Sequence, residues 1–542
     1  MSPIALKSVR AVARRLRGEA LTPLSGDSGG QAPQQGFEPE PRVSRRRLYV
    51  LALTVACAVV ASHLVALGTA PPGLFSDEAA FGYNGWAILH FGTDQYGTHW
   101  PLFFRSFGDY KGPAGVYSEA LLTSFLPLTP WAIRLPNALA GIALAFAAGW
   151  LGWRLTKSHA VVLILVLEAA FEPWFFHLGR TMLETDLLTP LCYVLTLAAL
   201  AAGGERRLRS CIAAGMLLGA ACFTAQPARF FTPALLVIVL LAFRRTLRGA
   251  RLAALVVPVA LALIILVSAS SAATARLGAV SVFNGSGLIG GIRLASADYL
   301  QYLGPVLLFI RGDSNLRHST GFGGLLFVTA AVPLALGAVA AFRRRSEPLA
   351  IIALLGMLIA PAGASLAVGV NARRVVVVLP FLLVLLAYGW QALVPWLRRR
   401  RPRMAVAVGC VLLAAVPYYL DYALVYPNRA ALSFEAGGLD AIARAHALAQ
   451  GHPILVSNDL GADALVALVP DPRLADPLGS AGVRLIVSAG DIEAAQPGDL
   501  LVLTPPDTPP LGATLLFQEV VRGPVSLAGG VVEVVLVSVY RR

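Results

Sequence analysis

The feature that most constrains this chain is a series of eleven apolar runs, most of them long enough to cross about 30 Å of hydrocarbon as a helix. They lie at 48–70, 132–153, 159–177, 183–202, 210–225, 229–243, 252–270, 320–342, 349–369, 375–397 and 404–420. The fifth and sixth are short, so they form either two spans or one re-entrant pair. Only 14% of the residues are charged, against about a quarter in soluble proteins. The sequence therefore predicts a polytopic α-helical membrane protein with about eleven spans.

Arginine clusters alternate with these runs in the way that membrane topology requires. One cluster precedes the first run, and every second connection is then basic: 45–47, 154–157, 206–209, 244–251, 343–345 and 398–403. Because basic loops stay in the cytoplasm, the N-terminus is expected inside and, after an odd number of spans, the C-terminus outside. This placement also accounts for the net charge of +14 without nucleic acid as a partner. We expect a plasma (inner) membrane location.

Composition divides the chain into three parts. Residues 1–47 are rich in Arg, Pro and Gly, which predicts a disordered cytoplasmic tail. Residues 48–426 form the membrane module, and 427–542 are expected to form a small extracytoplasmic α/β domain. In that domain a helical stretch at 438–449 is followed by β-type runs at 453–457, 484–488, 499–503, 513–521 and 531–540.

The outer connection 71–131 holds the charged residues that suggest chemistry. Ser76 is placed to cap an amphipathic surface helix whose first turn carries Asp77 and Glu78. A second surface helix is expected to begin at Pro113. Acidic residues in a first turn also stabilise a helix without any other role. However, Lys111 follows in the same loop as the only lysine expected outside, and a carboxylate beside an ammonium suits a lipid phosphate and an acceptor hydroxyl.

Four short motifs resemble a known group of enzymes: SDEA, a GTD stretch, DYKGP, and RLPNALAG at the second span. The chain resembles the polyprenyl-phosphate-dependent GT-C glycosyltransferases, closest to the family 39-like group of protein mannosyltransferases and lipid A aminoarabinose transferases. The resemblance implies a GT-C-like module in which Asp77 and Glu78 are catalytic, with the aspartate acting on the acceptor, and Lys111 binds the donor phosphate. Those aminoarabinose enzymes carry Glu before the lysine, whereas this chain has Tyr110, with Asp109 one residue earlier. The same sugar is therefore not implied.

Further candidates lie near the outer ends of the spans. Glu184 matches a second acidic position of the family, with Asp186 as its competitor. Cations for the donor phosphate are Arg180, Arg373 and Arg374, with weaker candidates Arg317 and His318. Each also has a structural reading, because polar groups at a span end reach the interface and arginines form salt bridges. The sequence indicates no definite cofactor; a divalent metal is an open alternative, with Asp77 and Glu184 as its ligands. Glu168 and Glu172, within the third run, receive no role.

These residues favour a membrane glycosyltransferase that moves a sugar from a polyprenyl-phosphate donor to an acceptor hydroxyl on a protein, lipid or glycan at the outer face. Phosphate leaves as an anion, so the site needs a base for the hydroxyl and cations for the phosphate, and we expect inversion at the sugar carbon. The alternative is a lipid or glycan transporter or flippase, which would place polar groups at midplane in repeated halves. A non-catalytic scaffold would not require the charged loop.

The alternating arginines predict opposite locations for two points of the chain. Reporter fusions at Arg345 and at Arg542 should respond as cytoplasmic and extracytoplasmic, respectively. If both reporters are active on the same side, the outer site described above does not exist.

Overall fold

The computed structural model describes the whole chain except residues 1–44, 107–108, 202–205, 270–279, 525 and 528–529. The chain forms two compact units, Met1–Cys57 and Ala58–Arg542. The second unit contains every residue of the candidate site. Most of the predicted tail 1–47 lies outside the described residues, and the boundary expected near residue 427 stays a prediction.

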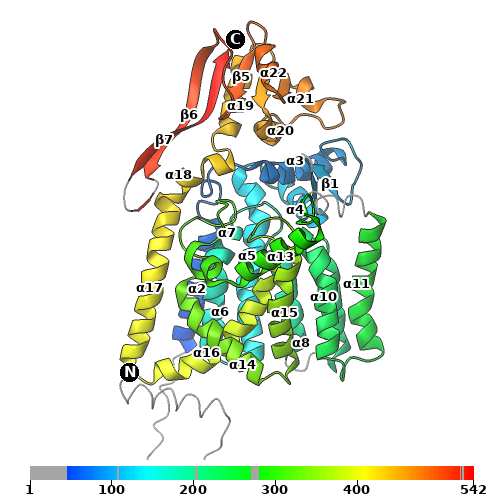
Figure 1. Cartoon of the computed structure of the whole chain (residues 1–542), viewed down its shortest axis with the longest axis vertical. Coiled ribbons are helices and arrows are strands. Elements are labelled where there is room, and N and C mark those ends of the chain that lie inside the picture. The colour runs from blue at the N-terminus through cyan, green and yellow to red at the C-terminus, as the bar shows by residue number, and fades with distance from the viewer. Residues whose placement is uncertain (1–44, 107–108, 202–205, 270–279, 525, 528–529) are drawn as a thin grey trace, which may run out of the picture. The chain divides into compact units, whose positions relative to one another are not determined.

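The described chain is mostly helical, and Figure 1 shows its elements in sequence colours. The apolar helices are α2 (Arg45–Leu64), α5 (Pro130–Thr156), α6 (His159–Phe171), α8 (Leu188–Leu200), α9 (Leu208–Ala221), α10 (Gln226–Ala242), α11 (Ala250–Ser268), α14 (Ala331–Arg343), α15 (Pro348–Ala364), α16 (Leu379–Arg398) and α17 (Arg401–Leu424). Among the described residues, four helical segments are long and apolar enough to cross a membrane: Pro130–Thr156, Ala250–Ser268, Val376–Arg398 and Arg401–Leu424. The other seven apolar helices have 10–17 residues.

Each predicted span overlaps one of these helices, but several boundaries differ; the largest difference is in the run 320–342, where α14 begins only at Ala331. The run 159–177 is broken where α6 ends at Phe171 and the short α7 (Pro173–Leu178) begins. Proline lacks the amide that would continue the ladder, and it disfavours helical backbone in the residue before it. The run expected from 183 becomes helical only at Leu188. The polar segment 179–187 is thereby left as an irregular connection.

The first outer connection folds into helix α3 (Ser76–Phe91), a hairpin of β1 (Phe104–Ser106) and β2 (Asp109–Lys111), and helix α4 (Pro113–Thr123). Contrary to expectation, α3 is not a surface helix with one apolar face. Ten of its sixteen residues are buried, including Glu78 and Asn84. A helix buried on most of its circumference belongs to a protein interior rather than to a membrane surface. Ser76 is also its first helical residue rather than its cap, which is Phe75.

Helix α3 is buried because the C-terminal part of the chain covers it. Leu465 and Val466, on α20 (Gly461–Leu468), share a buried apolar cluster with Phe81 and other residues of α3. The hydroxyl of Tyr83 donates a hydrogen bond to the Pro470 carbonyl at 2.5 Å. Figure 1 shows α3 next to α20. The amphipathic pattern in the sequence could not reveal this partner, because it lies almost four hundred residues away.

The described residues between α11 and α14, and those after α17, form mostly short elements. The former hold α13 (Gly287–Leu303), the π-helical turn η2 (Val306–Arg311) and the 3₁₀ turn η3 (Val328–Ala330). Another 3₁₀ turn, η4 (Val376–Val378), precedes α16. After α17 come α18 (Tyr426–Ala430) and η5 (Leu432–Phe434).

The C-terminal segment forms the predicted α/β fold. Its five-stranded sheet has the order β4-β3-β5-β7-β6, with β3 parallel to β4 and β5, and β7 antiparallel to β5 and β6. The strands are β3 (Ile454–Ser457), β4 (Val483–Ile486), β5 (Leu500–Leu503), β6 (Thr514–Pro524) and β7 (Val531–Arg541). The remaining elements are α19 (Gly438–Leu448), η6 (Asn458–Leu460), α21 (Pro477–Ser480) and α22 (Ala489–Glu493). All five expected strands and the expected helix at 438–449 are present.

Helices α14 and α16 approach closely through a glycine, and this contact generates a prediction. A Cβ added at Gly389 on α16 would overlap the carbonyl group of Pro333 on α14. Small residues allow such backbone approach between apolar helices. We expect Gly389→Ala to destabilise the protein by about 1–3 kcal/mol, the usual cost of overpacking, measured as thermal unfolding in detergent. Gly409→Ala on α17, where a Cβ meets open space, is the control and should leave the unfolding temperature unchanged or slightly higher.

Candidate active site

A buried ion pair fixes the start of α3. The Arg134 guanidinium donates to both carboxylate oxygens of Glu78, from Nε at 2.9 Å and from Nη2 at 2.7 Å, and both side chains are fully buried. Arg134 also donates to the carbonyls of Leu67, Pro71 and Gly73 at 2.7–3.1 Å. A buried arginine needs such partners for all its N–H groups. Glu78 and Arg134 therefore bind α3, α5 and the connection before α3 into one unit.

The remaining contacts of Glu78 are to the backbone. Its oxygens accept from the amides of Phe75 at 3.2 Å and Met182 at 2.8 Å. Because protein donors occupy both of its oxygens, Glu78 supports the site rather than offering a free carboxylate to an acceptor. Its contact with Met182 reaches the irregular segment 179–187, which carries Glu184 and Asp186.

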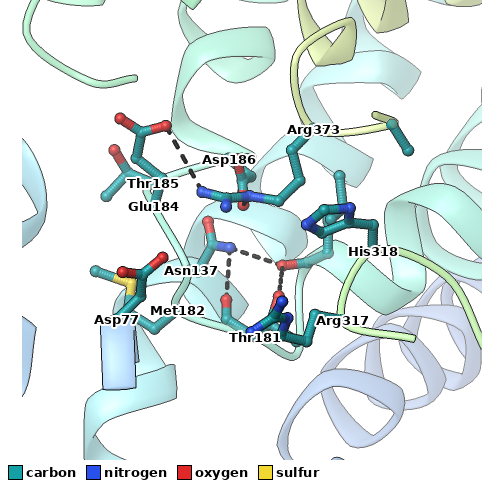
Figure 2. Close-up of polar contacts among 12 residues, drawn as sticks. Asp77, Asn137, Thr181, Met182, Glu184, Thr185, Asp186, Arg317, His318 and Arg373 are labelled. Carbon is teal, nitrogen blue, oxygen red and sulfur yellow. Dashed lines mark hydrogen bonds and ion pairs between the residues drawn. The ribbon is translucent and has the colours of Figure 1, made fainter. Parts of the chain in front are cut away.

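Asn137 holds the same segment from α5. Its amide donates to the carbonyls of Leu178 and Thr181 at 2.6 and 2.8 Å, and its oxygen accepts from the Leu187 amide at 3.1 Å. Figure 2 shows Asn137 bridging to this segment. Asn137 belongs to the RLPNALAG motif, but sequence reasoning gave it no role. A buried amide within an apolar helix was the signal that could have identified it.

Asp77, next to Glu78, faces the hairpin instead. Its Oδ1 lies 2.5 Å from Nζ of Lys111, the last residue of β2. The Lys111 side chain is 4% exposed and that of Asp77 is 23% exposed. Strand β2 brings Lys111 here through its register with β1, in which Lys111 pairs with Phe104. The structure thus joins the two residues that the sequence singled out first.

Arg373 lies opposite, between the two acidic residues of segment 179–187. Its Nε donates to Oδ2 of Asp186 at 2.9 Å, and its Nη2 lies 3.6 Å from Oε2 of Glu184. The other oxygen of Glu184 accepts from the Gln226 amide at 2.9 Å. Arg373 also interacts electrostatically with Asp77. Figure 2 shows the carboxylates of Asp77 and Glu184 and the Arg373 guanidinium in one region.

Two further predicted candidates, Arg317 and His318, border this region (Figure 2). The Arg317 guanidinium stacks over the Phe75 ring at 3.9 Å. Burial lowers the pKa of Arg317, and the nearby Asp77 carboxylate opposes that shift. His318 donates from Nδ1 to Oδ2 of Asp313 at 3.0 Å. Its partner is therefore a carboxylate, Asp313, which the sequence analysis did not single out.

Asp313 organises the loop that carries Arg317 and His318. Its oxygens accept from the amides of Asn315 at 2.9 Å and Ala372 at 2.7 Å, besides the His318 ring. Burial alone would raise the pKa of Asp313, but these hydrogen bonds outweigh it and leave the pKa below its ordinary value. Because Ala372 precedes Arg373, Asp313 couples the positions of Arg317 and Arg373.

Two of the other candidates, Arg180 and Arg374, donate to backbone carbonyls. Arg180 is buried and donates to the carbonyls of Ser62, Val65 and Ala70 and to the hydroxyl of Tyr422, so its contacts are structural. Arg374 donates to the carbonyls of Val368 and Gly369. Asp109 lies on β2, but its side chain is outside the described part of the structure.

The two glutamates without an assigned role also have structural partners. Glu168 accepts from the Trp390 indole at 2.7 Å, and Glu172 from the Phe327 amide at 2.6 Å.

The polar cluster consists of Asp77, Lys111, Glu184, Asp186, Arg317 and Arg373. It offers three cations around one partly exposed carboxylate, an arrangement that can hold an anion close to a proton acceptor. Among the residues that the structure describes, no group of three or more His, Cys, Asp or Glu side chains is placed to hold a metal ion.

Comparison with known families gives one match. Residues 110–269 match the family model described as dolichyl-phosphate-mannose-protein mannosyltransferase. The matched segment contains Lys111, Arg134, Asn137, Glu184 and Asp186 and begins after Asp77. A comparison with curated protein sequences finds no match.

Two solved structures share the fold. The chain resembles the apo form of ArnT from Cupriavidus metallidurans with a TM-score of 0.53 and 14% identity, over 91% of this chain and 98% of that one. It also resembles the oligosaccharyltransferase of Archaeoglobus fulgidus, solved with a tethered acceptor peptide, with a TM-score of 0.50 and 13% identity. That match covers 79% of this chain, which spans 64% of the oligosaccharyltransferase. Together with the family match, the shared fold confirms the resemblance to GT-C glycosyltransferases and supports glycosyltransferase activity.

The contacts of Glu78 predict that it stabilises the protein, whereas its neighbour does not. Glu78→Gln leaves the Arg134 charge buried without its counterion, which typically costs about 3–5 kcal/mol. We expect a large drop in the unfolding temperature, or loss of folded protein after detergent extraction. Asp77→Asn at the neighbouring position is the comparison; it should lower the unfolding temperature less, because the Asp77 side chain is partly exposed to water. Equal unfolding temperatures for Glu78→Gln and the wild type would contradict the assigned role.

Proposed function

We propose that this GT-C glycosyltransferase moves a sugar from a polyprenyl-phosphate donor to an acceptor hydroxyl at the extracytoplasmic face of the membrane. The observation that carries the proposal is the contact between Asp77 and Lys111, with Arg373 and Arg317 nearby. A base and several cations in one place suit a reaction in which a hydroxyl loses its proton while a phosphate departs.

In the proposed reaction, the acceptor oxygen attacks the anomeric carbon while the bond from that carbon to the phosphate oxygen breaks. Asp77 takes the hydroxyl proton, and the lipid phosphate leaves with the bonding electrons, so no acid is needed. Attack from the side opposite the phosphate inverts the anomeric carbon. Lys111, Arg373 and Arg317 are proposed to stabilise the charge that grows on the phosphate.

The ion pair between Asp77 and Lys111 has a consequence for the order of events. While Lys111 Nζ lies 2.5 Å from Asp77, the carboxylate is a weaker base and the ammonium is occupied. A donor phosphate would compete for Lys111 and so release Asp77 for the acceptor. The donor is therefore expected to bind before the acceptor reacts.

The donor and the acceptor are proposed by chemical class. Oligosaccharyl transfer to a peptide is the chemistry named for one structural neighbour, and mannosyl transfer to protein is named for the matched family. A lipid-linked donor also explains why such an enzyme is embedded in a membrane, since nucleotide sugars are absent outside the cell.

Asp77→Asn tests the base directly. The amide keeps the size of the side chain but cannot accept the proton, so turnover should fall by roughly two to four orders of magnitude. The assay is consumption of polyprenyl-phosphate-linked sugars, beginning with mannose, by protein in liposomes. Near-normal turnover would leave Asp77 as a first-turn helix residue and remove the proposed mechanism.

Lys111→Ala should give the converse result. Binding of radiolabelled undecaprenyl phosphate should weaken by about tenfold or more, because a charge-assisted contact with phosphate is lost. In Asp77→Asn the same binding should persist. Lys111→Arg, which keeps the charge, is the matched control and should retain more binding than Lys111→Ala.

A further inference from the structure

The chain that leads into the C-terminal sheet packs directly against the start of α3. Gly73, two residues before the Phe75 cap, has a φ of +64°, and a Cβ there would collide with the backbone of Phe434 and Ala436. The Arg134 guanidinium, which donates to the Gly73 carbonyl, lies 5.7 Å from the Phe434 ring centre. Backbone therefore meets backbone here, and the position of residues 434–436 is tied to that of α3.

Glu435 occupies the centre of this contact. Its backbone is in the left-handed region, with φ 51° and ψ 37°, which is uncommon for a residue with a side chain. The amide of Ser76, the first residue of α3, lies close enough to its carboxyl group to lower the pKa of that group. Its Oε2 is buried without a hydrogen-bond partner among the described residues. The conformation of Glu435 thus places a carboxyl group at the N-terminus of the helix that carries Asp77.

The charged groups around Glu435 come from three parts of the chain. Asp77 lies on α3, Arg317 on the loop after η2, and Asp459 after β3. The fully buried Asp463 of α20 is a further neighbour. Burial, followed by the nearby Asp459 carboxylate, raises the pKa of Glu435 to about 9, while Arg317 opposes the shift. At neutral pH the group is therefore an uncharged acid.

We propose that Glu435 is a positioning residue for Asp77, so that the chain entering the C-terminal sheet forms part of the transfer site. It holds the first amide of α3 and thereby sets the direction from which Asp77 meets the acceptor. The inference rests on the proposed function, since it concerns the base of that reaction. It also gives the C-terminal segment a task in catalysis beyond the role of a separate outer domain.

Kinetics of two substitutions at Glu435 test this role. Glu435→Ala removes the acceptor for the Ser76 amide, and kcat should fall by roughly ten- to a hundredfold, as expected when a reacting group is misplaced by about 1 Å. Undecaprenyl phosphate binding should stay within about twofold of the wild type, because Lys111 and Arg373 are untouched. Glu435→Gln retains a carbonyl oxygen for the amide and should restore most of the loss.

The pH profile separates positioning from simple helix stabilisation. Above pH about 9, Glu435 becomes a carboxylate close to Asp77 and to the donor phosphate, so wild-type turnover should decline there. Because glutamine cannot ionise, Glu435→Gln should lack this decline. If Glu435 only capped the helix, the turnover of the wild type and of Glu435→Gln would depend on pH in the same way above pH about 9.

Glu519→Gln is the matched control. Glu519 lies on β6 of the same sheet and pairs with the exposed Arg444 at 2.6 Å, so neither turnover nor its pH profile should change. The inference is overturned if Glu435→Ala keeps wild-type kcat, or if Glu435→Gln and the wild type share one alkaline limb. Asp77→Asn measured in parallel distinguishes the two failures: if it is inactive while Glu435→Ala is normal, the proposed function stands and only the positioning role is lost.

Discussion

The buried pair of Glu78 and Arg134 is the interaction on which the rest of the site depends. A charge taken out of water is costly unless its partner and its hydrogen bonds are complete. Here Arg134 reaches the carboxylate and three backbone carbonyls, and Glu78 reaches two further amides. These contacts lock α3 to α5, to the connection before α3 and to the segment that carries Glu184 and Asp186. Removing either partner would leave the other charge buried without the group that donates to it or accepts from it.

Because Glu78 is held in this framework, its neighbour Asp77 is the carboxylate that we propose as the base. Asp77 is partly exposed and meets Lys111 rather than a buried arginine. Two adjacent carboxylates thus acquire different tasks from their surroundings alone. Arg373 is similarly held by Asp186 and Glu184. Both Lys111 and Arg373 are therefore paired with carboxylates, and in the proposed reaction the donor phosphate would compete for these pairs.

The C-terminal segment packs against α3 more closely than a separately appended domain would. Helix α20 covers α3, and the chain at Phe434–Ala436 packs on Gly73 without room for a side chain. This cover explains why α3 carries Tyr83 and Asn84 as buried residues instead of presenting a polar face to water. The sheet beyond has its own apolar core, formed with α19.

Sequence alone determined the features that depend on local or periodic physics. The apolar runs located the helices, because a segment in hydrocarbon must satisfy its own backbone. Runs of β-forming residues located the five C-terminal strands. The charged residues of the outer loop brought Asp77 and Lys111 to attention, and the family resemblance added Glu184. Only the tertiary structure decided that Glu78 is a framework residue, that Arg180 donates to backbone carbonyls, and that Asn137 and Asp313 hold the segments that carry the candidate residues. Those roles depend on contacts between residues that are tens or hundreds of positions apart in the sequence. Burial determines how much free energy an unpaired charge costs and which neighbouring groups can pair with it.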